Sequence, residues 1–293
     1  MSMFGFLSHG LFTHHASQST SGLSPALWRH VTNTVNGAGS ADGVRRLYLV
    51  GDDFSSVLSD NTSTNLYTSD GFYESYIDTG GTLAQLADES GGVLALNTDG
   101  TDNDQTWLAF GDSTNEEGIL GKIDNSTAAL DMLTAFEVRF KKGSIGDNAT
   151  SCFLGLGKPD IMGNDGMTDD TAVMKNDDFI GFHCKADDGD SLDFSFKATG
   201  QTVQDHIAGV HTLVADTFVK AGFVYDPAAP ADRRIKVYID NVEKSTYVTE
   251  TQVDAATFPE AEFMTFLAGV MNNDGSTSGE LAIDWWAFAQ VMP

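Results

Sequence analysis

Acidic side chains gather in one short segment, residues 99–104, between two apolar runs. Asp99, Asp102 and Asp104 supply three carboxylates there, and Asn103 adds an amide. Carboxylate and amide oxygens are hard ligands of the kind that calcium takes in proteins. The segment differs from an EF-hand loop because it lacks the glutamate at the twelfth position and the flanking helices. Calcium is therefore the one cofactor that the sequence indicates, and a solvated turn is the alternative interpretation.

Carboxylate pairs for glycoside hydrolysis are missing from the apolar runs. A retaining glycosidase needs two carboxylates about 5 Å apart, which a strand provides when acidic residues alternate on one face. Glu137 stands alone in FEVRF, and we expect Asp284 in IDWW to bond an arginine or a backbone group. The sequence also lacks a G-x-S-x-G elbow, an H-E-x-x-H motif and a P-loop. We therefore predict that the protein is not an enzyme.

The chain contains two cysteines, Cys152 and Cys184, each inside a run that we expect to be a strand. Two thiols in a chain of 293 residues do not make a disulfide scaffold. Buried free cysteines, compatible with synthesis in a reducing cytoplasm, are the simplest interpretation.

Strand signals dominate the elements that would position these groups. In residues 218–243 two alternating runs flank a proline-containing loop, which predicts a β-hairpin with one buried face. Short runs separated by Gly, Asp and Asn predict an all-β sandwich of two sheets. Helix is expected only at 24–31, where Ser24 would cap and Pro25 would begin the helix, and at 127–133 and 254–257. The other expected strands are residues 47–50, 92–97, 106–110, 135–141, 152–157, 179–184, 192–197, 212–213, 246–249, 263–271 and 281–291.

Several of these motifs carry a family resemblance. The hairpin GFVYD…IKVYIDN, the earlier GGVLAL and the final LAIDWWAFA together resemble concanavalin A-like (laminin-G-like) jelly rolls, especially those of tailed-phage virion proteins. The resemblance covers residues 47–293. It implies an antiparallel two-sheet jelly-roll sandwich, preceded by an extended N-terminal arm of residues 1–46.

Charge separates the arm from the body. The whole chain has 16 basic and 42 acidic residues and a net charge of −26, whereas residues 1–46 carry three arginines and one aspartate. Such acidity argues against nucleic acid and anionic membranes as partners, because phosphate binding needs clustered cations. No run approaches the roughly 18 apolar residues of a membrane helix.

Apolar anchors without steady periodicity are spread through the arm among Ser, Thr and Gly, which is typical of a segment that orders against a partner. An arm folded onto its own domain is the alternative. The residues expected to make the partner contact are Phe4, Phe6, Leu7, Leu11, Phe12, Trp28, Arg29, Arg45 and Arg46.

Aromatic residues in the polar segment 55–82 are a second candidate contact surface, for a partner or a sugar: Tyr67, Phe72, Tyr73 and Tyr76. Trp285 and Trp286 are neighbours in one expected strand, so their side chains should point to opposite faces, and at least one should lie in the core.

These observations together predict a virion structural protein. Given the resemblance, we expect a capsid decoration or cement protein of a tailed bacteriophage, made in the host cytoplasm and located in the virion. Its partners would be the major capsid protein and neighbouring copies of itself in a homo-oligomer. The alternative is a lectin-like module or tail protein that binds a surface glycan or host receptor.

Overall fold

The β12–β13 hairpin forms as its alternating sequence predicts. In the computed structural model, β12 (Val219–Tyr225) pairs antiparallel with β13 (Ile235–Ile239), with Tyr225 opposite Ile235 and Ala221 opposite Ile239. Asp240 and Asn241 both have positive φ, 46° and 68°, which is the backbone of a two-residue hairpin turn. They lead into β14 (Val242–Val248). The structure describes residues 22–36, 46–55, 65–68, 71–86, 92–111, 118–124, 132–147, 149–163, 166–167, 174–175, 177–275 and 278–292.

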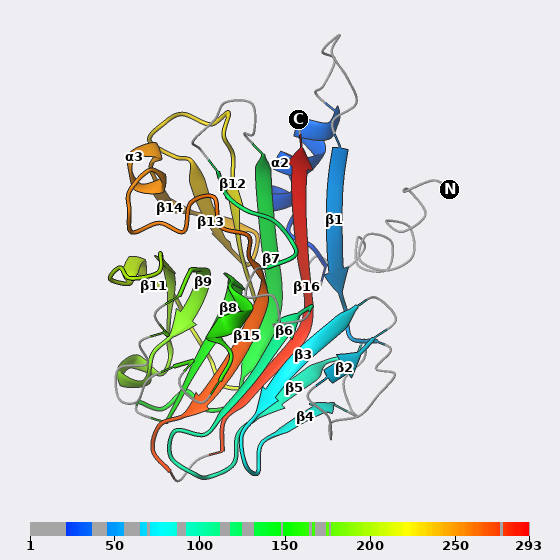
Figure 1. The fold of residues 1–293 in the computed structure, drawn as a ribbon, viewed down its shortest axis with the longest axis vertical. Coiled ribbons are helices and arrows are strands. Elements are labelled where there is room, and N and C mark those ends of the chain that lie inside the picture. The colour runs from blue at the N-terminus through cyan, green and yellow to red at the C-terminus, as the bar shows by residue number, and fades with distance from the viewer. Residues whose placement is uncertain are drawn as a thin grey trace.

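Two antiparallel sheets pack face to face and confirm the predicted jelly-roll sandwich (Figure 1). The first sheet has the order β14-β13-β12-β7-β16-β5-β4, and β1 also pairs with β16; the second has the order β11-β10-β9-β8-β15-β6-β3-β2. In the first sheet the remaining strands are β1 (Arg46–Asp52), β4 (Thr82–Gln85), β5 (Leu94–Asn97), β7 (Leu133–Lys142) and β16 (Glu280–Met292). The second contains β2 (Asn65–Tyr67), β3 (Phe72–Ile77), β6 (Gln105–Phe110), β8 (Thr150–Gly157), β9 (Phe179–Cys184), β10 (Ser191–Lys197), β11 (Gln204–Thr212) and β15 (Thr265–Asn272).

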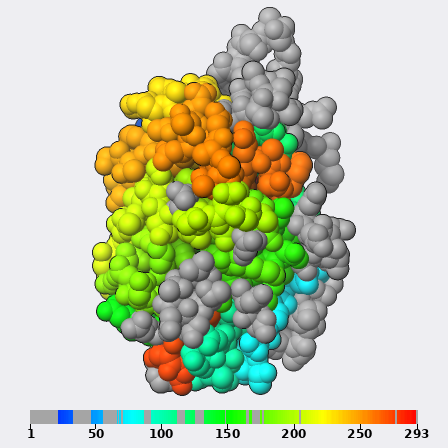
Figure 2. Space-filling view, turned by 60° about the vertical axis from the view of Figure 1, so that its left-hand side comes forward, coloured from blue at the N-terminus to red at the C-terminus, as the bar shows by residue number. Residues whose placement is uncertain are grey.

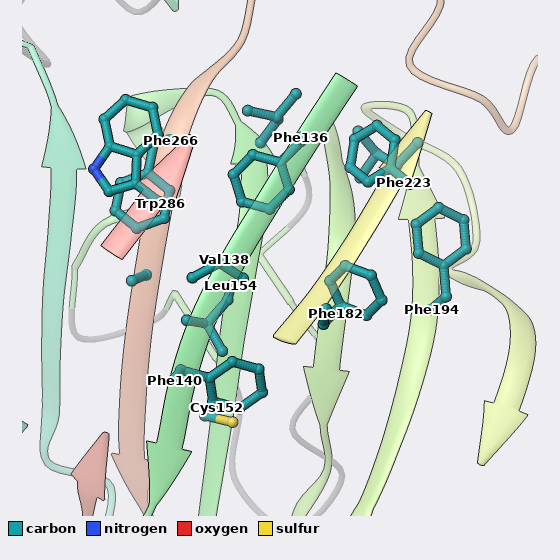
Figure 3. Close-up of a cluster of buried hydrophobic side chains, with 14 of the residues drawn as sticks. Phe136, Val138, Phe140, Cys152, Leu154, Phe182, Phe194, Phe223, Phe266 and Trp286 are labelled. Atoms are coloured by element: carbon teal, nitrogen blue, oxygen red, sulfur yellow. The ribbon is translucent and has the colours of Figure 1, made fainter. Parts of the chain in front are cut away.

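The main core fills the space between the two sheets (Figure 3). Phe136 and Phe223 come from adjacent strands of the first sheet and contact Phe266 and Phe194, respectively, of the second. Trp286 stacks on Phe266 with ring centroids 4.6 Å apart. Its neighbour in β16, Trp285, belongs to a separate cluster on the outer face of the first sheet, as the alternation of a strand predicts.

Helix α2 (Pro25–Asn36) covers that outer face (Figure 1). It begins at Pro25, as predicted, and the amides of Leu27 and Trp28 donate to the carbonyl of Ser24. Leu27, Trp28 and Val31 pack against apolar residues of β7, β12, β13 and β16. For Trp28 this corrects the expectation of a contact with another molecule, because the chain's own sheet buries the indole. Within the described residues, no helix has the length and apolar character needed to span a membrane.

Several elements differ from the sequence prediction. Helix α2 ends at Asn36 instead of residue 31, and β2, β3 and β4 form in and beside the polar segment 55–82. Helix α3 is Glu250–Val253 rather than 254–257, because Thr249 and Gln252 form a capping box that starts the helix earlier. Strand β11 covers nine residues where only 212–213 were expected, because its pairing with β10 is interrupted by bulges and Gly209 has positive φ, which obscures the alternation. The expected helix at 127–133 falls mostly outside the described residues, and its last residue begins β7.

Candidate functional site

The structure brings two of the three predicted calcium ligands together. Asp104 is 7% exposed, and its Oδ2 has no hydrogen-bond partner. Burial, and then the adjacent carboxyl of Asp99, raise the pKa of Asp104 to about 7. The hydrogen bond from Asp104 lowers the pKa of Asp99, which also accepts a 2.7 Å bond from the Thr101 amide. The pair therefore holds one proton below about pH 7 and loses it as the pH rises further.

Asp102 is exposed and lies beside Gly275, apart from this pair. The described part of the chain contains no group of three His, Cys, Asp or Glu side chains arranged to hold a metal ion. The predicted three-carboxylate site is therefore wrong as a unit, because the turn directs Asp102 to solvent. Calcium binding by the Asp99–Asp104 pair stays a prediction.

The substitution Asp104→Asn should stabilise the protein, relative to the unsubstituted chain, more at pH 8 than at pH 5. Because the pKa of Asp104 is raised from 3.8 to about 7, the folded protein keeps a proton that the unfolded chain releases above about pH 4. The stability from this proton is complete below about pH 4 and is lost as the pH rises through about 7. An amide stays neutral, so the melting temperature of Asp104→Asn relative to the unsubstituted protein should rise between pH 5 and pH 8.

Asp102→Asn is the matched control, and its melting temperature should follow the unsubstituted protein across the same pH range. A parallel profile for Asp104→Asn would contradict the shared proton. Calcium would compete with that proton, so any calcium-induced rise in melting temperature should grow with pH and vanish in Asp104→Asn.

The predicted aromatic surface in residues 55–82 does not form as expected. Tyr73 is fully buried: its hydroxyl donates to Asp52 and accepts a 2.8 Å bond from the Trp286 indole. The correction has a simple cause, because β3 is an inner strand between β2 and β6, and alternate residues of such a strand enter the core. Phe72 is half-buried, and Tyr76 packs on the outer face of the second sheet. The Tyr67 side chain lies outside the description.

Most of the predicted arm contacts cannot be placed. Arg29 is exposed on α2, and one guanidinium nitrogen lies 4.0 Å from a carboxylate oxygen of Glu243. Docking of the arm on a partner stays a prediction. The residues of this surface whose side chains lie outside the description are Phe4, Phe6, Leu7, Leu11, Phe12, Arg45 and Arg46.

A polar cluster that the sequence search missed lies on the outer face of the second sheet. Phe182 and Cys184 of β9 point into the core, which places His183 on the outer face, directly opposite Asp193 of β10. Lys185 follows β9 and makes ion pairs with Asp193, at 3.4 Å, and with Asp205 of β11.

Hydrogen bonds from neutral donors add to the ion pairs that hold this cluster together. Ser195 donates a 2.8 Å hydrogen bond to Asp205, and the amide of Gly209 donates a 2.7 Å bond to Asp193. The side chains of Lys185, Asp193 and Asp205 are 25%, 11% and 31% exposed, so a ligand can reach Lys185 and Asp205 directly. Figure 2 shows the yellow-green surface, which includes β11, on the side that faces the viewer.

The two carboxylates of the cluster have opposite protonation tendencies. Burial raises the pKa of Asp193. Burial alone would also raise the pKa of Asp205, but hydrogen bonds from Lys185 and Ser195 hold it below its usual value. Two carboxylates that differ in proton affinity, joined by one ammonium, offer acceptors and a donor to a hydroxyl group, and the one with the raised pKa is the more easily protonated.

Elsewhere on this face apolar groups replace the charges. A cluster over β6, β8 and β15 buries Trp107, Phe153 and Leu267. Residues from the segment after β8, including Ile161 of the 3-10 turn Pro159–Ile161, contribute to its cover. The charged groups are therefore concentrated at the β9–β11 end.

Comparison with solved structures identifies the fold. No family model and no curated protein matches the chain. An endo-1,3-beta-glucanase from Streptomyces sioyaensis is similar in structure, with a TM-score of 0.52 and 12% identity over 87% of this chain and 100% of that one. The fold is a concanavalin A-like jelly roll.

Two further solved structures are similar to the chain. A protein of unknown function from Shewanella oneidensis MR-1 has a TM-score of 0.51 and 13% identity, over 89% of this chain and 94% of that one. A winged bean acidic lectin has a TM-score of 0.49 and 12% identity, over 85% and 100%. At these identities the likeness establishes the concanavalin A-like sandwich and nothing finer. The link to tailed-phage virion proteins stays a prediction.

Proposed function

We propose that the protein binds a neutral carbohydrate at the polar cluster of Lys185, Asp193, Ser195 and Asp205. The observation that carries the proposal is the pairing of two carboxylates with opposite pKa shifts on one lysine. Sugar hydroxyls both donate and accept hydrogen bonds, so they match a surface that offers an ammonium, an anion and a hydroxyl. The net charge of −26 favours neutral over acidic glycans, because a polyanion would be repelled.

The fold supports the choice of ligand class. The sandwich is shared with an endo-1,3-beta-glucanase, so soluble β-1,3-glucan oligosaccharides are the first ligands to test. This support is an analogy of fold, and the cluster's own chemistry carries the rest.

Glycoside hydrolysis is a second candidate, favoured by the same two carboxylates. A carboxyl with a raised pKa beside one with a lowered pKa is the arrangement that separates a general acid from a nucleophile or base. The prediction that the protein is not an enzyme was based on patterns within single strands, whereas Asp193 and Asp205 lie on different strands. Whether the protein hydrolyses a glycan can therefore be decided by direct measurement.

Isothermal titration with β-1,3-glucan oligosaccharides tests the proposal. Asp205→Asn should weaken binding by about 10- to 100-fold, because losing a hydrogen bond to a charged group costs about 1.5–3 kcal/mol. Asp187→Asn, on an exposed turn outside the cluster, is the matched control and should bind like the unsubstituted protein. Equal affinities for the two variants would refute this site.

A reducing-sugar assay on the same samples separates binding from hydrolysis. Release of reducing ends that Asp193→Asn and Asp205→Asn both abolish would assign the second candidate. Binding without release would assign a lectin-like module.

The virion role predicted from the sequence is compatible with this proposal as host-receptor or surface-glycan recognition. Particle composition would discriminate the two locations, since a decoration protein is present in hundreds of copies and a tail protein in a handful. Light scattering of the purified chain tests the proposed homo-oligomer, in which arms from neighbouring copies would offset the repulsion between acidic bodies.

A further inference from the structure

The two cysteines face each other across neighbouring strands. Cys152 of β8 lies directly opposite Cys184 of β9, and both side chains point into the core between the sheets. Figure 3 shows the sulfur of Cys152 beside Phe140. Both thiols are free and buried. Opposite residues of an antiparallel pair have Cα atoms about 4.5–5.5 Å apart, which lies within the range that a disulfide spans.

A lysine from the other sheet completes the cluster. Lys142, at the end of β7, is 1% exposed, and its Nζ donates to the carbonyls of Thr150 and Gly189, both at 2.8 Å, and to Cys184 Sγ at 3.3 Å. These three contacts use the three N–H donors of an ammonium. A buried ammonium is costly unless an anion compensates it, and the Cys184 thiolate is the group among these partners that can do so.

The charges around Cys184 favour its thiolate. The hydrogen bond from the Cys152 thiol lowers its pKa, burial opposes this, and Lys142 lowers it further, so that the pKa is about 7. Asp193, on the neighbouring β10, acts in the opposite sense. The pKa of Cys152 is raised well above its usual value. Above about pH 7 the pair therefore consists mainly of a Cys184 thiolate and a Cys152 thiol, which gives the two cysteines distinct roles.

We propose that Cys152 and Cys184 are a redox-active dithiol that closes to a disulfide between β8 and β9, with Cys184 as the attacking thiolate. The oxidant is a low-molecular-weight disulfide. Cys184 attacks one of its sulfurs, the S–S bond breaks, and one thiolate leaves. Cys152 then loses its proton and attacks Cys184 Sγ in the mixed disulfide, which expels the second thiolate. The protein loses two electrons and the oxidant is reduced to two thiols.

The position of the pair provides a route for the oxidant. Cys184 is the last residue of β9, and Lys185, the 3-10 turn Ala186–Asp188 and Gly189 follow it. Before it loses its proton, the Cys184 thiol donates a 3.0 Å hydrogen bond to the Gly189 carbonyl, so this turn closes over the sulfur. Opening of one surface turn therefore exposes the thiolate without separating the two sheets.

Oxidised glutathione at pH 7 is the probe, and intact mass and thiol titration of the folded protein are the measurements. The unsubstituted protein should lose two titratable thiols and two hydrogens without retaining an adduct. Cys152→Ser should stop at one glutathione adduct, because the resolving thiol is missing. Cys184→Ser should react at least about tenfold more slowly, since the remaining thiol has a raised pKa.

Lysine variants test the role of the ammonium. Lys142→Met should slow the reaction about tenfold at pH 7 and recover toward pH 9, where the thiolate forms unaided. Lys141→Met is the matched control, because Lys141 points to the outer face and lies over the Phe218 ring; its rate should be unchanged. Two thiols that stay free in the folded protein while the urea-unfolded chain oxidises would overturn the proposal. Equal adduct formation in Cys152→Ser and Cys184→Ser would also overturn it, and these two variants decide the matter even if Lys142→Met does not fold.

Discussion

Replacing Trp28 with alanine should lower the free energy of unfolding by about 3–5 kcal/mol and release helix α2 from the first sheet. The indole is 4% exposed, and its Nε1 donates a 2.6 Å hydrogen bond to Glu137 Oε2. Glu137 is fully buried in the middle of the sheet face, where burial raises its pKa and the Ser24 amide donates a second bond at 3.0 Å. The variant leaves a cavity and also removes a hydrogen bond from a buried carboxyl, so both losses add.

Trp28→Phe separates the two contributions. Phenylalanine keeps most of the buried area but cannot donate to Glu137, so the expected loss is about 1–3 kcal/mol. Arg29→Ala, on the exposed side of the same helix, is the matched control and should stay within about 0.5 kcal/mol of the unsubstituted protein. Urea unfolding followed by circular dichroism gives these values, and amide hydrogen exchange of residues 25–32 reports release of the helix. Equal stability of Trp28→Ala and Arg29→Ala would contradict the docking of α2.

Strands were predictable where the two faces of a strand differ in polarity. β9 has the predicted bounds, and β12 and β13 form the hairpin predicted within residues 218–243, because each strand has an apolar face in the core and ends at a turn. β11 was largely missed because bulges in its pairing with β10 break the period of two. Helix α3 was misplaced by four residues, although the T-x-x-Q capping box at Thr249 was a usable signal.

The candidate sites also divide into those that the sequence could predict and those that it could not. The Asp99–Asp104 pair was predictable because both residues lie in one short turn. Asp193 and Asp205 come together through strand pairing and a shared lysine, and neither relation can be read from spacing along the chain. Lys142 was hidden for another reason: in FEVRFKK it continues a charged strand end, although its side chain enters the core and meets Cys184.

Trp28 shows how far the contacts of residues 1–46 can be predicted from the sequence. A few apolar residues among flexible ones indicate that something covers them, but the sequence does not say whether the cover is the same chain or another. The sheet face that receives α2 is recognisable only once β7, β12, β13 and β16 are placed side by side.

Asp52→Ala should have an effect as large as that of Trp28→Ala, about 3–5 kcal/mol, because it leaves several buried donors without an acceptor. The Asp52 side chain is buried and accepts hydrogen bonds from the Tyr73 hydroxyl at 2.9 Å, the Phe54 amide at 2.7 Å and the Thr68 hydroxyl. Tyr73 in turn accepts from the Trp286 indole, so the carboxylate ends a chain of polar contacts that joins β1 and β16 of the first sheet to β3 of the second.

Asp53→Ala is the matched control for this network, because the adjacent carboxylate accepts a 3.0 Å bond from the exposed Ser55 amide. Its loss should cost less than about 1 kcal/mol. Tyr73→Phe should fall between the two variants, since it removes one donor to Asp52 and the acceptor of the Trp286 indole while keeping the ring. Urea unfolding monitored by tryptophan fluorescence measures all three, and Trp286 itself reports the change in its surroundings. If Asp52→Ala unfolds at the same urea concentration as Asp53→Ala, the network does not hold the sheets together, and the stacked Trp286 and Phe266 rings carry that contact alone.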